Sequence, residues 1–161
     1  MFIYEGDDEY PKVEGLYDPS LVEVPAARKI EDTKKLEQLV MANDKRIRMA
    51  QAYYGEGTTN MVMENSKGLK LSKKVNSGYF YTQVIASDGE DQRTGFEFVF
   101  SNDYNDFDLE ALATKAANKA TAMLGAKPCD SGNYEILLTN QASASLLNPY
   151  LSMFSAEAVQ R

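Results

Sequence analysis

Residues 47–101 alternate apolar and polar side chains with a period of two, and this pattern constrains the fold more than any other feature of the sequence. Successive side chains of a β-strand point to opposite faces, so a period of two indicates strands that turn one face to a core. Turn-forming residues interrupt the pattern at 65–68 and at 88–91. The region therefore predicts an antiparallel meander.

We expect about five strands in this meander. The first begins at Ile47, and Gly55-Glu56-Gly57 is interpreted as a loop before a second strand, TTNMVMEN. This loop lacks the third glycine and the following helix of a phosphate-binding motif. LKLSKKV and GYFYTQVIAS are the third and fourth strands. The fifth, QRTGFEFVFS, places Phe96, Phe98 and Phe100 on one face.

Two segments with helical spacing flank the meander. Pro25 suits the start of a helix, where its missing N–H costs nothing, and apolar residues at helical spacing follow over about 26–42. An Ala-rich helix comes after the meander and is stopped near Gly125 and Pro128. The Asp, Gly and Pro residues of 1–25 indicate an extended arm. The expected fold class is therefore α+β.

The last part of the chain indicates a second domain. YEILLT, residues 134–139, is a continuous apolar run, which is typical of a strand buried on both faces. A helix begins after it and shows no stop signal. We interpret 129–161 as the first strand and helix of another domain, cut from a longer protein. The alternative is that 129–161 packs back onto the meander. The expected division is 1–25, 26–128 and 129–161.

The chain contains no histidine among its 161 residues, which restricts its chemistry. Ser-His and Cys-His nucleophile pairs and His-ligated zinc are excluded, so any catalysis needs carboxylates, Lys, Tyr or Cys129. A net charge of −7 argues against a general nucleic-acid binder. A single cysteine excludes an intrachain disulfide and fits a cytoplasmic location. The sequence contains no run of about 18 apolar residues, so it predicts no membrane span.

One local patch departs from this acidic balance. Lys67, Lys70, Lys73 and Lys74 lie together on the predicted hairpin. Lysines on an edge strand commonly prevent sheet-to-sheet aggregation. We favour that interpretation over a phosphate site.

The order of these elements resembles the TldD/PmbA (TldD/TldE) family, which is linked to peptide maturation and to modulation of DNA gyrase. The resemblance runs from about residue 26 to the end. It implies that 26–128 is the later part of the family's N-terminal domain and that 129–161 opens the C-terminal domain. It is carried by the helix ending LVMANDKRI, the turn Asn65-Ser66-x-Gly68, the Ala-rich helix LEALATKAANKATAMLGAKP, SGNYEILLTNQASASLL and FSAEAV.

The resemblance also implies the loss of a zinc site. TldD-type members carry His-Glu-x-x-x-His after Leu-Leu, and their histidines bind zinc while the glutamate serves the bound water. Here Leu146-Leu147 is followed by Asn148 and Pro149 at the first His and Glu positions, and Met153 stands at the second His. We expect a PmbA (TldE) type with no catalytic residue, metal or cofactor. Pro149 in a first helical turn would preserve the helix; alternatively, Asn148 is only a helix cap.

The resemblance implies a non-catalytic subunit of a TldD/TldE-like metallopeptidase complex that acts on peptides or unfolded segments. Its partner would be a TldD-like zinc subunit or a second copy, with no direct contact to nucleic acid or membrane. The alternative is a stand-alone module that takes up a peptide at an open sheet edge. A carboxylate-based hydrolase is least favoured, because no carboxylate pair stands apart from the surface charge. The sequence assigns no binding residues.

Overall fold

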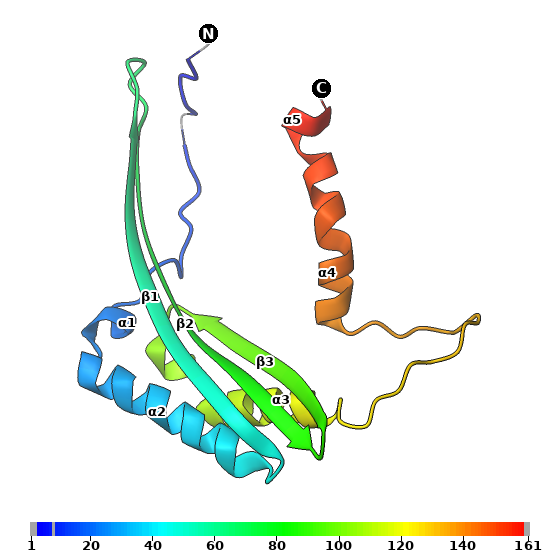
Figure 1. The fold of residues 1–161 in the computed structure, drawn as a ribbon. Coiled ribbons are helices and arrows are strands. Elements are labelled where there is room, and N and C mark those ends of the chain that lie inside the picture. The colour runs from blue at the N-terminus through cyan, green and yellow to red at the C-terminus, as the bar shows by residue number, and fades with distance from the viewer. Residues whose placement is uncertain (1–2, 8, 160–161) are drawn as a thin grey trace. The chain divides into compact units, whose positions relative to one another are not determined.

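The structure, a computed structural model, describes residues 3–7 and 9–159 (Figure 1). The chain divides into one unit over 1–126 and another over 127–161. The elements of the first unit are α1 (Ser20–Glu23), α2 (Ala26–Asn43), β1 (Ile47–Glu64), β2 (Lys70–Asp88), β3 (Asp91–Ser101), the 3-10 turn η1 (Tyr104–Asp106) and α3 (Leu109–Thr121).

The strands form a three-stranded antiparallel sheet in the order β1-β2-β3. β1 pairs with β2 from Ile47 opposite Ala86 to Glu64 opposite Lys70. The pairing of β2 with β3 begins at the tight turn after Asp88 and stops at Gly78, opposite Ser101. The β1–β2 hairpin therefore continues well past the end of β3, as Figure 1 shows.

The expectation of five strands is wrong, because two predicted interruptions lie inside continuous strands. Gly55-Glu56-Gly57 belongs to β1 and pairs residue for residue with β2. The ring of Tyr79 covers Gly55 so closely that a Cβ atom there would lie 2.5 Å from it. The glycine makes room for an aromatic ring, and the chain does not turn. Residues 76–78 likewise continue β2.

Helices α2 and α3 cover one face of the sheet and enclose the core with it. Phe80 and Val84 of β2 are fully buried there, together with Leu36 of α2 and Ala116 of α3. Gly95 of β3 allows a close approach of α3, since a Cβ atom at this position would lie 2.5 Å from the backbone nitrogen of Ala120. The small residues of α3 thus let its backbone rest on the sheet.

The two long helices agree with the sequence. α2 begins directly after Pro25 and ends at Asn43. In α3, the side chain of Asp108 accepts a hydrogen bond from the backbone N–H of Ala111 and caps the helix, as acidic residues at helix starts commonly do. An antiparallel sheet flanked by helices confirms the α+β class.

The segment expected to be an extended arm over 1–25 is not extended throughout. Residues 9–19 lack regular structure, but α1 is a short helix whose Leu21 is buried against Gly78. A Cβ atom at Gly78 would lie 2.7 Å from the Leu21 side chain, so this glycine provides the space for the anchor. Burial of the Leu21 side chain against the sheet stabilises this helical turn.

The second unit contains α4 (Asn140–Leu151), the 3-10 turn η2 (Ser152–Phe154) and α5 (Ala156–Val159). The predicted helix in this region is confirmed, but the predicted strand YEILLT is not. Residues 134–139 pair with no strand within the described part of the chain. Leu137 is 96% exposed and Ile136 is 73% exposed. Apolar side chains alone do not make a strand without a partner for its backbone.

Among the residues that the structure describes, no helix combines the length and the apolar character that crossing a membrane requires.

Candidate functional site

The three positions expected to replace a zinc motif lie toward the end of the helical segment of the second unit. Asn148 and Pro149 belong to the last turn of α4, and Met153 lies in η2. The helix starts much earlier, because the Thr139 hydroxyl accepts a hydrogen bond from the backbone N–H of Ala142 at 3.2 Å and caps it. The interpretations of Asn148 as a cap and of Pro149 as a first-turn residue are therefore wrong.

The helix tolerates Pro149 for a different reason. A proline inside a helix removes one hydrogen bond and strains the turn before it. α4 ends at Leu151, and its continuation is a 3-10 turn in which the Ser152 hydroxyl donates to the carbonyl of Pro149 at 3.0 Å. The lost hydrogen bond is the one to the carbonyl of Ser145, and the α-helix continues for only two residues beyond the proline.

The donor groups at these positions do not fit zinc. Zinc in proteins is held by thiolate, imidazole or carboxylate groups. Asn148 offers only an amide, Pro149 offers no side-chain donor, and the thioether of Met153 suits softer metals. Among the side chains that the structure describes, no three from His, Cys, Asp or Glu come together as a cation site. We therefore derive no reaction step through a metal in this chain.

The second unit exposes an apolar helical surface. Leu146, Leu147 and Leu151 of α4 are between 56% and 64% exposed, and Phe154 of η2 is 80% exposed. Isolated apolar residues on a surface are ordinary, but several within three turns of one helix are typical of a contact surface.

A polar cluster that sequence reasoning missed lies beside the core of the first unit. Lys29 is 8% exposed, and its ammonium group donates to both carboxylate oxygens of Glu56, at 2.8 and 2.7 Å, and to the carbonyl of Leu21. The Tyr54 hydroxyl donates to the same carboxylate at 2.7 Å. Lys29 thus bonds acceptors on α1 and β1, whereas Tyr54 bonds an acceptor on its own strand.

A second carboxylate, from α2, continues this cluster. Asp32 accepts hydrogen bonds from Arg28 at 2.8 Å and from the Tyr104 hydroxyl at 3.0 Å. Burial and then the bond to Asp32 raise the pKa of Tyr104, and burial and the bond to Glu56 raise the pKa of Tyr54. Both tyrosines therefore stay protonated donors near neutral pH. The cluster joins α1, α2, β1 and η1, and each of its two carboxylates accepts hydrogen bonds from a cationic side chain and from a tyrosine hydroxyl.

No local signal in the sequence points to this cluster. Lys29 and Glu56 lie 27 positions apart. Their contact depends on α2 lying along β1, and only the tertiary structure supplies that arrangement. The sequence analysis placed Glu56 in a loop, where it would have no buried partner.

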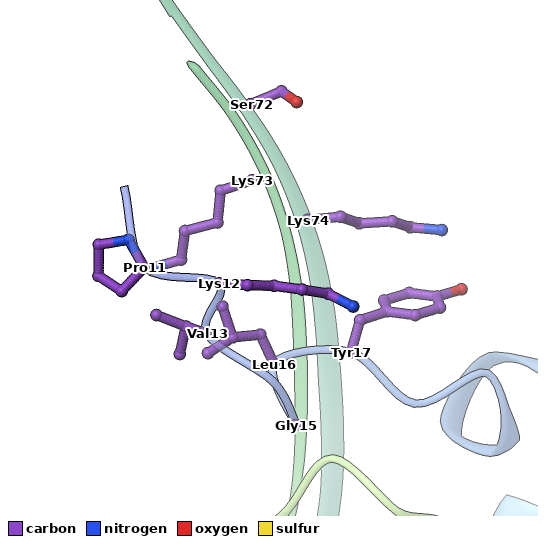
Figure 2. A pocket seen from close by; sticks show the side chains of 9 residues that line it. All are labelled: Pro11, Lys12, Val13, Gly15, Leu16, Tyr17, Ser72, Lys73 and Lys74. Atoms are coloured by element: carbon purple, nitrogen blue, oxygen red, sulfur yellow. The ribbon is translucent and has the colours of Figure 1, made fainter. Parts of the chain in front are cut away.

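A hollow lies between the arm and the outer edge of β2 (Figure 2). Its volume is about 430 Å³, and the residues around it are Pro11, Lys12, Val13, Gly15, Leu16, Tyr17, Ser72, Lys73 and Lys74. The ammonium group of Lys74 lies 3.7 Å from the centre of the Tyr17 ring, a cation–π contact. In Figure 2, Lys12 and Lys74 point toward this ring, whereas Lys73 points to the other side of the strand.

The face of the sheet opposite the helices is aromatic. Tyr53, Phe96, Phe98 and Phe100 are between 44% and 64% exposed on it. The rings contact one another across strands, with 5.7 Å between the centres of Tyr79 and Phe100. The predicted common face of Phe96, Phe98 and Phe100 is thus confirmed as the outer face of the sheet.

Comparison with known proteins identifies this architecture. Residues 19–124 match the family model of the PmbA/TldA metallopeptidase central domain. No curated protein matches the chain.

Three solved structures are similar to it. A candidate modulator of a DNA gyrase from Thermotoga maritima is 27% identical, with a TM-score of 0.91 over 99% of this chain and 37% of its own. A candidate modulator of DNA gyrase from Bacteroides thetaiotaomicron is 23% identical, with a TM-score of 0.85 over 96% of this chain and 36% of its own. TldE from Thermococcus kodakarensis is 22% identical, with a TM-score of 0.57 over 70% of this chain and 25% of its own.

The three-stranded sheet with helices on one face thus belongs to a metallopeptidase-related class of α+β domains. The family model covers most of the first unit, and the chain is a member of the PmbA/TldD family. It spans no more than 37% of the length of these solved relatives.

Proposed function

We propose that this chain is part of a non-catalytic, zinc-less subunit of a TldD/TldE-like metallopeptidase complex. The observation that carries the proposal is the donor set at Asn148, Pro149 and Met153, which does not fit zinc in a chain that belongs to a metallopeptidase family. The whole chain also lacks histidine. The zinc then belongs to a partner subunit with the His-Glu-x-x-x-His motif.

The partner would contact the apolar side of α4 and η2. Leu146, Leu147, Leu151 and Phe154 offer enough exposed apolar surface there to favour association. The partner is a TldD-like zinc subunit or, without one, a second copy of this chain. The substrates of the complex are peptides or unfolded segments in the cytoplasm.

Metal content and co-purification test this proposal together. The chain, purified without a histidine tag, should contain substoichiometric zinc by elemental analysis. It should co-purify with a co-expressed His-Glu-x-x-x-His member of the family, and the zinc should follow that partner. A stoichiometric amount of zinc in the isolated chain would contradict a zinc-less subunit.

We also propose that the chain does not bind duplex DNA directly, although two similar structures carry the name of gyrase modulators. The net charge of −7 repels phosphate, and the hairpin lysines could neutralise only a few phosphates. A gel shift at about 150 mM salt should show no sequence-selective retention. Submicromolar selective binding would contradict this.

The second candidate function is a stand-alone module that binds a peptide at an open sheet edge. The observation that favours it is the part of β2 that extends beyond the end of β3 and so has no strand on its outer side. Such edges can accept an extended peptide by main-chain hydrogen bonding. Failure to co-purify with any zinc-bearing family member would favour this candidate over the subunit.

A further inference from the structure

The outer edge of β2 near Ser72 carries backbone groups that can receive another strand. Along an antiparallel strand, the N–H and C=O groups of successive residues point alternately to the two sides. The backbone N–H of Asn76 points away from β1, because it donates to the carbonyl of Leu16 in the arm at 3.0 Å. Ser72 and Lys74 have the same parity as Asn76, so their N–H and C=O groups also point outward.

These outward groups have no main-chain partner among the described residues. β3 ends opposite Gly78, and the described backbone bonds between the arm and β2 do not include Ser72 or Lys74. Unpaired edge groups are the template on which strand addition operates.

The arm is held at both ends and leaves a space between them. Near the hairpin turn, the Asn65 side chain donates to the carbonyl of Tyr4 at 2.6 Å. Near the base, the Asn76 side chain bonds both the N–H and the carbonyl of Asp18. Between these two anchors lies the hollow of about 430 Å³ beside Ser72 and Lys74 (Figure 2).

The charge of this hollow is positive. Lys12, Lys73 and Lys74 are three of the nine residues around it, and none of the nine is acidic. Lys12 has only a long contact of 3.7 Å to Glu14, and both side chains of that pair are more than 80% exposed. Such a pair contributes little, so Lys12 is available to another carboxylate.

The free edge of β1 offers a different environment. Glu56 and Glu64 belong to that strand, and the hollow of about 420 Å³ beside it is lined by Lys34 and by Lys29, which is already bonded to Glu56. An acidic ligand is therefore favoured at the β2 edge and disfavoured at the β1 edge.

We propose that the β2 edge at Ser72–Lys74 binds an acidic peptide segment in extended conformation. The peptide backbone pairs with the outward groups of Ser72 and Lys74, and its carboxylate side chains meet Lys73 on one face and Lys12 and Lys74 on the other. Main-chain pairing supplies affinity, and the lysines select acidic sequences. The proposal specifies the ligand of the second candidate function and rests on it, but it does not require the zinc-less subunit assignment, since the site lies entirely within the first unit.

Binding of synthetic peptides to the full chain tests the ligand class. The probe is a fluorescein-labelled, C-terminally amidated peptide of alternating Glu and Val, compared with the same peptide carrying Gln or Lys in place of Glu. Fluorescence anisotropy should show saturable binding of the Glu peptide that weakens as salt rises. Equal binding of all three peptides, or no binding of the Glu peptide, would overturn the proposal.

Two proline substitutions on opposite strands test the edge. Ser72→Pro removes an outward N–H without removing a β1–β2 bond, and Val62→Pro does the same on β1, because Val62 lies directly opposite Ser72. Ser72→Pro should weaken Glu-peptide binding by about tenfold, which corresponds to one or two hydrogen bonds. Val62→Pro should leave it nearly unchanged. The reverse order would show that the peptide uses β1.

Amide signals of the unmutated chain provide an independent test, because it does not depend on whether the proline variants fold. In a ¹⁵N-labelled sample, the Glu peptide should shift the amide signals of Ser72 and Lys74 and slow their exchange with solvent. The amides of Asn60 and Val62 serve as the control. Changes confined to Asn60 and Val62 would overturn the assignment to the β2 edge. Co-purification with a zinc subunit is read separately, so failure of one proposal leaves the other standing.

Discussion

Lys29 of α2 donates hydrogen bonds to both carboxylate oxygens of Glu56 in β1, at 2.8 and 2.7 Å, although the two residues lie 27 positions apart in the chain. The lysine side chain is 10% exposed and the glutamate side chain 36% exposed. The pair connects the first long helix to the strand that follows it. Its removal should therefore affect the stability of the whole first unit.

Replacing the lysine tests this connection. Lys29→Met keeps the apolar stem but leaves the Glu56 carboxylate with Tyr54 as its remaining side-chain donor. We expect a loss of about 1–2 kcal/mol in the free energy of unfolding, measured by urea denaturation. Lys34→Met, at an exposed position of the same helix, is the matched control and should change stability by less than about 0.5 kcal/mol. Equal effects of the two substitutions would deny the pair a structural role.

The same pair predicts a dependence of stability on acid. Burial alone would raise the pKa of Glu56, but hydrogen bonds from Lys29 and Tyr54 and the charge of Lys29 outweigh it, so the pKa lies below its ordinary value of 4.5. A carboxyl with a lowered pKa in the folded state stabilises the fold above its ordinary pKa, and that contribution is lost as the pH falls through the folded value. The free energy of unfolding should thus decline below about pH 4.5.

The variant Glu56→Gln measures how much Glu56 contributes to this loss of unfolding free energy in acid. The amide does not titrate, so the difference in stability between the variant and the unmodified chain should shrink as the pH falls from about 7 to about 3.5. Asp44 and Asp103, whose pKa values are also lowered, still titrate in both proteins. A difference that stays constant across this range would show that Glu56 titrates normally.

Gly95 tests the contact between the sheet and α3. A Cβ atom at Gly95 would lie 2.5 Å from the nitrogen of Ala120 and 2.8 Å from the carbonyl oxygen of Ala116, and both are backbone atoms that cannot rotate away. Gly95→Ala should cost about 1–3 kcal/mol by thermal or urea unfolding. Gly57→Ala is the control, because nothing lies within 4 Å of the corresponding Cβ position. A larger loss at Gly57 would show that α3 does not rest on the sheet as described.

Deleting the second unit tests the proposed domain division of 1–25, 26–128 and 129–161. The first unit has its own core, so a chain ending at residue 128 should unfold cooperatively in circular dichroism. Loss of the exposed leucines of α4 should also reduce any self-association seen by light scattering. An unfolded product would mean that 129–161 is an integral part of the first fold.

Helices and the class of the fold could be predicted from the sequence, because their signals are local. The spacing of apolar residues after Pro25 and the capping residue Asp108 both act within a few positions. The number of strands could not be predicted in this way. Gly55 and Gly78 suggest interruptions, yet each accommodates a side chain from elsewhere in the chain, Tyr79 and Leu21 respectively.

The candidate sites also differ in whether local sequence signals or only the tertiary structure reveals them. The identities of Asn148, Pro149 and Met153 are legible in the sequence, and they suffice to judge the donor chemistry. Their positions near the helix end depend on the cap at Thr139, whose signal sequence reasoning did not use. The hollow beside Ser72 needs the arm and the hairpin to come together, which no local pattern encodes.

The ring of Tyr79, which lies over Gly55 on the aromatic face, helps to fix the register in which β1 pairs with β2. A slip of β1 by one residue would exchange its two faces, and the apolar aromatic side of this sheet would penalise the exchange less than a polar side would. Steric fit at glycines discriminates instead. Gly78 and Gly95 admit Leu21 and α3 on the helix-covered face, while Gly55 admits Tyr79 on the aromatic face. The lack of a side chain at these three glycines thus distinguishes the helix-covered face of the sheet from its aromatic face.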